Sequence, residues 1–122
     1  MKTFVVNLER DKNKKDQIQN ECRKAKLDYE IISAIDGREL NDSELSSKVN
    51  PVSINYLSKG EIGCALSHQT IYKKILDDNI DYALILANDV EISQDINQFI
   101  SGFLTLQDKS KGDVFFFLPF GL

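Results

Sequence analysis

Residues 82–86, Tyr82-Ala83-Leu84-Ile85-Leu86, form an unbroken apolar run that leads into Ala87-Asn88-Asp89. Three further runs are equally short and rich in β-branched, leucine or aromatic residues, and they cover residues 3–8, 29–35 and 114–118. Several of these runs are continuous rather than alternating, which is typical of strands buried on both faces of a sheet. We therefore predict four strands in a mainly parallel sheet.

Helical patterns separate these runs. Residues 11–26 and 96–104 carry apolar side chains at helical spacing, and the strongest pattern covers residues 58–78. There Ser58 and Glu61 have the spacing of a capping box. Residues 36–57 lack sustained periodicity, so we expect a long loop, with a short helix as an option near residues 43–49. The order of elements predicts an α/β fold, a Rossmann-like three-layer α/β/α sandwich.

Composition limits the class of protein. The chain has 122 residues and a formal net charge of −4, and 42% of it is hydrophobic. This length suits a single domain over residues 1–122, and the acidic balance argues against nucleic acid as the main partner. Cys22 and Cys64 make neither a disulfide framework nor a zinc site, so we expect buried or half-buried thiols in a reducing compartment. No run approaches the ~18–20 apolar residues of a transmembrane segment, so we expect a cytoplasmic protein, at most peripheral to a membrane.

Candidate site residues follow the predicted strands, because parallel sheets bind ligands beyond the carboxyl ends of their strands. The P-loop, the G-x-G-x-x-G fingerprint and the G-x-S-x-G elbow are all absent, so a nucleotide would have to be held by other means. Asp89 suits Mg²⁺ or Mn²⁺ bound against a diphosphate, and Glu91 is near enough in sequence to assist. The alternative for Asp89 is a solvated turn acid.

Other candidates lie near the first and third runs. Arg10 has the guanidinium geometry that binds phosphate, with a solvated helix face as its alternative. His68, the sole histidine, lies one helical turn after Cys64 and is either a ligand-binding or a structural residue. Gly60 and Gly63 in the first turn of the strongest helix suggest the close approach of a neighbouring strand or a ligand. The three lysines after Arg10 are expected on a solvated helix face: Lys12, Lys14 and Lys15.

Four ordered stretches carry a family resemblance. They read F-V-V-N-L-E-R at residues 4–10, A-I-D-G at 34–37, L-S-K-G-E-I-G-C-A-L-S-H at 57–68 and Y-A-L-I-L-A-N-D-V at 82–90. The set resembles glycosyltransferase family 25, the lipopolysaccharide and lipooligosaccharide galactosyltransferases, whose domain type collagen galactosyltransferases share. The likeness covers essentially this whole chain, and about the N-terminal half of the family's catalytic domain.

The resemblance implies a GT-A-like domain that transfers a hexose, most often galactose, from a UDP-sugar to a lipooligosaccharide or lipopolysaccharide glycan acceptor, with Mn²⁺ or Mg²⁺ bound. It suggests that the transfer inverts the anomeric configuration of the sugar. It also suggests a protein that is cytoplasmic or peripheral to the inner membrane. By position, the implied donor-binding residues are Asn7, Arg10, Asp36, Gly37, Glu61, Ser67 and His68. The implied metal ligands are Asp89 and Asn88. No catalytic residue is assigned.

The acidic motif departs from the family pattern. The family's E-D-D reads Ala87-Asn88-Asp89 here, so one carboxylate replaces three and we expect a weakly bound dication. The later strands of the family domain are not in this chain, and a sheet edge left exposed in this way would favour a homodimer.

Two alternatives stay open. The first is a truncated, catalytically inactive remnant, or a nucleotide-sugar-binding module on the same fold. The second and more remote is a phospho-receiver domain, which requires an acidic pair after the first strand where this chain has Asn7-Leu8-Glu9-Arg10.

Overall fold

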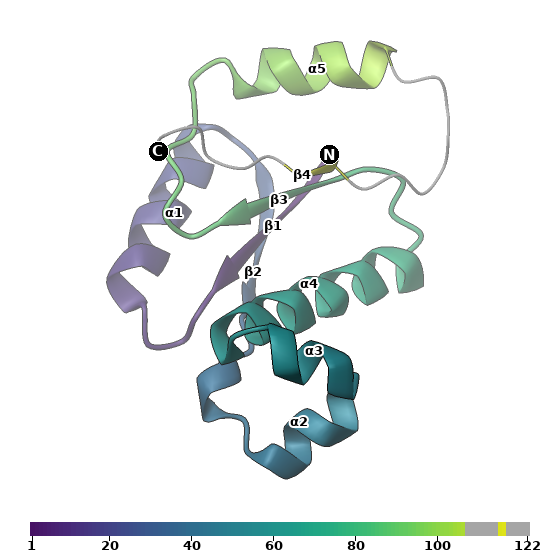
Figure 1. Cartoon of the computed structure of the whole chain (residues 1–122). Coiled ribbons are helices and arrows are strands. Elements are labelled where there is room, and N and C mark those ends of the chain that lie inside the picture. The colour runs from purple at the N-terminus through teal and green to yellow at the C-terminus, as the bar shows by residue number, and fades with distance from the viewer. Residues whose placement is uncertain (107–114, 117–122) are drawn as a thin grey trace.

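A parallel sheet organises the fold (Figure 1). In the computed structural model, which describes residues 1–106 and 115–116, the strand order is β2-β1-β3-β4. The strands are β1 (Lys2–Asn7), β2 (Asp28–Ser33), β3 (Ala83–Ala87) and β4 (Phe115–Phe116). Each neighbouring pair is parallel, which confirms the predicted α/β class and parallel sheet. The remainder of the predicted strand over residues 114–118 lies outside the described residues.

Helices cover both faces of the sheet, as predicted. On one face, α1 (Lys12–Lys24) and α5 (Ile96–Leu106) lie over β1 and β3. On the other face, α4 (Lys59–Asp77) packs against the same two strands. The first face buries Val5, Ile18, Cys22, Leu84, Leu86 and Ile100, and the second buries Phe4, Ile71, Ile75, Ala83 and Ile85. No helix in the described part of the chain has the length and apolar content needed to cross a membrane.

The helices α1 and α4 both end in a left-handed residue. Lys26 has φ 54° and Asn79 has φ 52°. In each case the next N–H reaches back to the last turn, from Leu27 to the Cys22 carbonyl and from Ile80 to the Ile75 carbonyl, both at 3.0 Å. These are Schellman endings, and each one turns the chain directly back toward the next strand.

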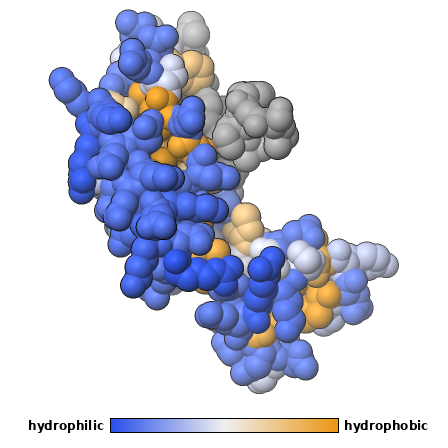
Figure 2. Space-filling model, turned by 90° about the vertical axis from the view of Figure 1, so that its left-hand side faces the viewer, coloured by the Kyte–Doolittle hydropathy of each residue, from blue (hydrophilic) through white to orange (hydrophobic). Residues whose placement is uncertain are grey.

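The prediction of a long loop over residues 36–57 is wrong. This segment forms a 3₁₀ helix η1 (Gly37–Glu39) and two short helices, α2 (Asp42–Lys48) and α3 (Pro51–Tyr56); the optional helix near residues 43–49 corresponds to α2. Figures 1 and 2 show α2 and α3 as a lobe that stands out from the sheet. Its small core joins the lobe to α4 and contains Leu40, Leu45 and Ile62.

The two cysteines differ in exposure. Cys22 is buried in α1, and burial, with the nearby charge of Glu21 adding to it, raises the pKa of its thiol to about 11. Cys64 is exposed, so the expectation of a buried or half-buried thiol is wrong for this residue. Both are free thiols, as predicted.

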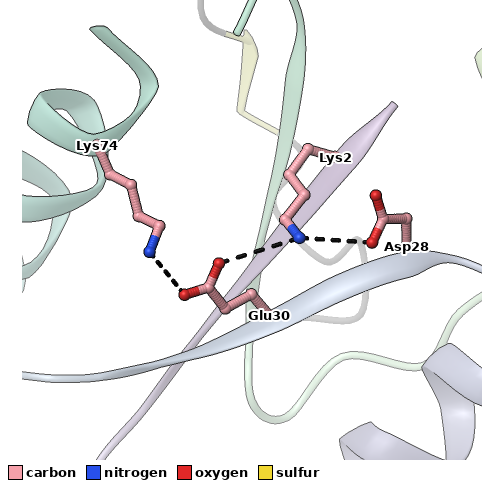
Figure 3. A network of polar contacts seen from close by, with 4 residues as sticks. All are labelled: Lys2, Asp28, Glu30 and Lys74. Atoms are coloured by element: carbon pink, nitrogen blue, oxygen red, sulfur yellow. Dashed lines mark hydrogen bonds and ion pairs between the residues drawn. The ribbon is translucent and has the colours of Figure 1, made fainter. Parts of the chain in front are cut away.

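The amino ends of β1 and β2 carry a charged network (Figure 3). Lys2 lies 3.4 Å from Asp28 and 3.9 Å from Glu30, and Lys74 of α4 reaches the other Glu30 oxygen at 2.7 Å. Two cations and two carboxylates thus neutralise one another at the amino edge of the sheet.

Candidate functional site

A cavity of about 450 Å³ opens at the carboxyl edge of the sheet, where β1, β2 and β3 end. Because β2 and β3 lie on opposite sides of β1, this is the topological switch point at which such sheets bind ligands. The volume falls within the range of small-molecule sites, roughly 300–1,000 Å³. Apolar side chains line it, among them Val6, Leu8, Ile35, Ile85 and Leu86. The polar residues that line it are Arg10, Asp11, Lys14, Asp36, Arg38, Ser67, His68 and Asn88.

One wall of the cavity is a contact between two main chains. A Cβ on Gly63 of α4 would lie 2.5 Å from the Gly37 nitrogen and 2.6 Å from the Ile35 carbonyl oxygen. A Cβ on Gly37 would likewise overlap the carbonyl group of Lys59. The close approach predicted for Gly63 is therefore to the segment after β2. Gly60, in contrast, has only the Ser58 hydroxyl near the Cβ position, at 3.9 Å.

Ser67 joins the same two segments. Its buried hydroxyl accepts a hydrogen bond from the Ile35 N–H at 2.8 Å and donates one to the Gly63 carbonyl at 2.7 Å. Ser67 therefore holds the end of β2 against α4. Both of its bonds are to main-chain groups, and they fix the wall on which the rest of the site depends.

Arg10 and Asp36 meet across the strand ends. The Arg10 guanidinium donates to one Asp36 oxygen at 2.5 Å, and the other oxygen accepts from the Arg38 N–H at 3.1 Å, which caps η1. The Asp36 side chain is 13% exposed and that of Arg10 is 54% exposed. Asp36 thus orients Arg10 and leaves the outer guanidinium donors open to the cavity mouth.

Asn88 connects the ends of β1 and β3. Its amide nitrogen donates to the Asn7 side-chain oxygen at 2.9 Å and lies 3.4 Å from an Asp11 oxygen. The Asn7 amide donates in turn to the Leu8 carbonyl at 2.9 Å. Asn7 is buried beneath the site and is absent from the cavity lining, so it acts on the site through its neighbours.

Glu61 and Asp89 also lie outside the cavity lining. Glu61 closes the predicted capping box of α4, accepting from the Ser58 N–H at 3.2 Å while its own N–H donates to the Ser58 hydroxyl at 3.1 Å. The Ser58 backbone N–H, aided by the hydroxyl, lowers the pKa of Glu61. Asp89 is exposed beyond β3. In the described residues, no group of three or more His, Cys, Asp and Glu side chains is arranged to hold a metal ion.

His68 and Cys64 share the face of α4 that borders the cavity. The His68 Nδ1 lies 2.9 Å from the Cys64 carbonyl oxygen and 3.7 Å from its sulfur. The His68 ring also lies 6.2 Å from the ring of Tyr72. The Nδ1–carbonyl contact is that of an N–H donor, which fixes the imidazole orientation beside the cavity.

Three charged residues at the cavity were missed as site residues from the sequence: Asp11, Lys14 and Arg38. Lys14 was predicted on a solvated helix face, but the first turn of α1 borders the cavity. A signal existed, because Lys14 lies one helical turn after Arg10 and Arg38 follows Asp36-Gly37 directly.

Comparison with known proteins agrees with the motifs. The model of glycosyltransferase family 25 (LPS biosynthesis protein) matches residues 1–118. Human procollagen galactosyltransferase 2 is 30% identical over 113 residues, 86% of this chain and 18% of the relative. A glycosyltransferase 25 family member from Aedes aegypti is 32% identical over 95 residues, 71% of this chain and 16% of the relative.

A third relative, the inactive glycosyltransferase 25 family member 3 of Mus musculus, is 25% identical over 103 residues, 78% of this chain and 17% of the relative. The chain therefore spans less than a fifth of the length of these relatives. With a Rossmann-like sheet, a cavity at its switch point and a family match over nearly its whole length, the chain belongs to glycosyltransferase family 25.

Proposed function

We propose that the cavity binds a nucleoside diphosphate sugar, and that the protein transfers a hexose from a UDP-sugar to a glycan acceptor. The observation that carries the proposal is the cavity itself, with an apolar lining and a basic rim at the switch point of the sheet. The relatives named procollagen galactosyltransferase support galactose as the hexose. The family description, which mentions lipopolysaccharide biosynthesis, supports a lipopolysaccharide glycan as the acceptor. A cytoplasmic location, at most peripheral to the inner membrane, is part of the same proposal.

Transfer breaks the bond between the sugar and the diphosphate and forms a bond from the sugar to an acceptor hydroxyl oxygen, whose proton passes to a base. Negative charge therefore grows on the leaving diphosphate, and a site accelerates the reaction by stabilising that charge. Arg10, which Asp36 orients, lines the cavity and would donate to the diphosphate.

The site has few ligands for a divalent cation, so we expect any such ion to bind weakly. Ala87 has no ligand atom, the Asn88 nitrogen is directed at Asn7 and Asp11, and Asp89 is a single exposed carboxylate. Asp89 with the Asn88 carbonyl oxygen would hold Mn²⁺ or Mg²⁺. When bound, the cation would supply positive charge to the diphosphate.

Calorimetry with UDP and UDP-galactose tests donor binding. We expect saturable heat for both, weakened by Arg10→Gln, whereas Lys48→Gln on α2 is the control because Lys48 is exposed and outside the cavity. If neither nucleotide binds in the presence or the absence of Mn²⁺, the donor assignment is wrong.

The loss of acidic side chains at Ala87 and Asn88 favours a second candidate, a nucleotide-sugar-binding module without transferase activity. Incubation with radiolabelled UDP-galactose and lipooligosaccharide acceptors separates the two functions. Sugar incorporation supports the transferase, and donor binding without incorporation supports the module.

A further inference from the structure

The cavity is locally basic in an acidic protein. The chain has a formal net charge of −4, yet the charged residues around the cavity are three cations, Arg10, Lys14 and Arg38, against two carboxylates, Asp11 and Asp36. Figure 2 is turned toward the side of the molecule that carries α1, and hydrophilic residues dominate that face. An excess of cations confined to a cavity favours an anionic ligand.

The cations come from three separate segments around the cavity. Arg10 follows β1, Lys14 lies in the first turn of α1, and Arg38 lies in η1 after β2. Within residues 1–106 and 115–116, neither Lys14 nor Arg38 forms an ion pair, and both side chains are exposed. Only Arg10 has a carboxylate partner, Asp36. At least two positive charges are therefore available to a ligand.

Carboxylate groups are scarce at the end of β3, where a divalent cation would be expected to bind. At the end of β3, Ala87 offers no ligand and Asn88 turns its N–H donors toward Asn7 and Asp11. Asp89 lies outside the cavity lining. The strand ends thus place cationic side chains around the cavity and a single carboxylate beyond it. A site that takes its positive charge from a bound metal would instead have several carboxylates at this position.

We propose that Arg10, Lys14 and Arg38 supply the positive charge for the diphosphate, so that the cavity binds a nucleoside diphosphate without a divalent cation. This inference rests on the proposed function, since it takes the ligand to be a nucleoside diphosphate. Guanidinium groups bind phosphate oxygens in a bidentate manner and an ammonium group acts as a point charge, so two arginines and one lysine suit a diphosphate.

The test is calorimetric titration of the full chain with UDP, once in EDTA and once with millimolar Mn²⁺. We expect the two dissociation constants to agree within about threefold, and Lys14→Gln and Arg38→Gln each to weaken UDP binding by about tenfold in EDTA. Uridine, which lacks the diphosphate, should lose no affinity in either variant. Each variant should also reduce the salt dependence of UDP binding, since one charge contact is removed.

The controls are Lys48→Gln and Lys73→Gln, which remove exposed cations outside the cavity and should leave UDP binding unchanged. Circular dichroism of each variant checks that the fold is retained. UDP binding that requires Mn²⁺ would overturn this inference and leave the proposed function standing. UDP binding in EDTA that is equally strong in Lys14→Gln and Arg38→Gln would overturn the assignment of these residues. Absence of UDP binding under both conditions would overturn the inference and the donor assignment together.

Discussion

The two edges of the sheet place charge in opposite ways. At the amino edge, Lys2, Asp28, Glu30 and Lys74 pair with one another near the solvent, and their charges cancel (Figure 3). At the carboxyl edge, polar groups are held by buried serine, asparagine and main-chain contacts, and among the described residues Lys14 and Arg38 have no ion-pair partner beside the cavity. Exposed ion pairs contribute little to stability, whereas buried contacts position the groups around them. Substitutions at the two edges should therefore differ sharply in effect.

The largest effect is expected at the contact between main chains. Gly63→Ala would place a methyl group against the Gly37 nitrogen and the Ile35 carbonyl, and main-chain atoms cannot move aside as a flexible side chain can. We expect a loss of about 3 kcal/mol in the free energy of unfolding. Denaturant unfolding provides the measurement. Gly60→Ala is the matched control in the same helix. Its Cβ would meet only the Ser58 hydroxyl at 3.9 Å, an ordinary contact, so the variant should gain up to about 1 kcal/mol.

Ser67→Ala is expected to have the next largest effect. The substitution leaves the part-buried Ile35 N–H without its partner, which costs about 1–3 kcal/mol of stability. Thr70→Ala in the same helix is the control, since the Thr70 hydroxyl bonds to the Leu66 carbonyl on an exposed face. Equal unfolding free energies for the two variants would contradict the role given to Ser67.

An intermediate effect is expected from Asn88→Asp. The new carboxylate would face the Asp11 carboxylate and the Asn7 oxygen without a hydrogen to donate, so we expect a loss of about 1–2 kcal/mol at neutral pH. The reciprocal double variant Asn88→Asp with Asp11→Asn should recover most of that loss, because it removes the like-charge contact and returns an amide donor.

The pH dependence gives this prediction a second readout. The nearby Asp11 charge disfavours ionisation of the new carboxyl at position 88 and raises its pKa in the folded variant, so the penalty is full at neutral pH and disappears as the pH falls below that pKa. Unfolding measured from neutral to mildly acidic pH should therefore bring Asn88→Asp back toward the wild type. A penalty that persists in acid would point to a packing defect.

The smallest effect is expected at the amino edge, from Glu30→Gln. The hydrogen bond and the charge of Glu30 raise the pKa of Lys74. The stabilisation this gives is complete below the pKa of lysine in the unfolded chain and is lost as the pH rises through the raised folded value. The free energy of unfolding of the wild type should therefore be slightly higher than that of the variant at neutral pH. In strong alkali the two free energies should be equal. NMR titration of Lys74 checks the pKa, and added salt should reduce the stability difference.

The strands and main helices were predictable because burial on both faces leaves continuous apolar runs and amphipathic stripes in the sequence. The helix α2 was predicted only as an option and α3 was not predicted, since the residues that begin these helices are also turn residues. Asn41 caps α2 with a capping box, Asn50 caps α3, and Pro51 opens α3. Polar caps and proline in short helices have the composition of a loop.

The candidate site was predictable as a location and less so as a set of residues. The family resemblance led to Arg10, Asp36 and Asn88, all of which line the cavity. It also led to Asp89, which the turn after β3 places outside the lining. Sequence spacing alone does not tell whether Glu61 serves a helix cap or a ligand, or that the first turn of α1 brings Lys14 to the cavity, because both depend on how helices dock on the sheet.

The contact between Gly37 and Gly63 also limits how this binding site can change. A wall made of main-chain atoms has the same shape whatever side chains surround it, and a larger residue at either glycine would push the wall apart rather than reshape it. Variation in ligand preference must then come from the exposed side chains that line the cavity, among them Lys14 and Arg38. For protein engineering, Gly37 and Gly63 are therefore positions to keep, whereas Lys14 and Arg38 are positions to vary when a different ligand is sought.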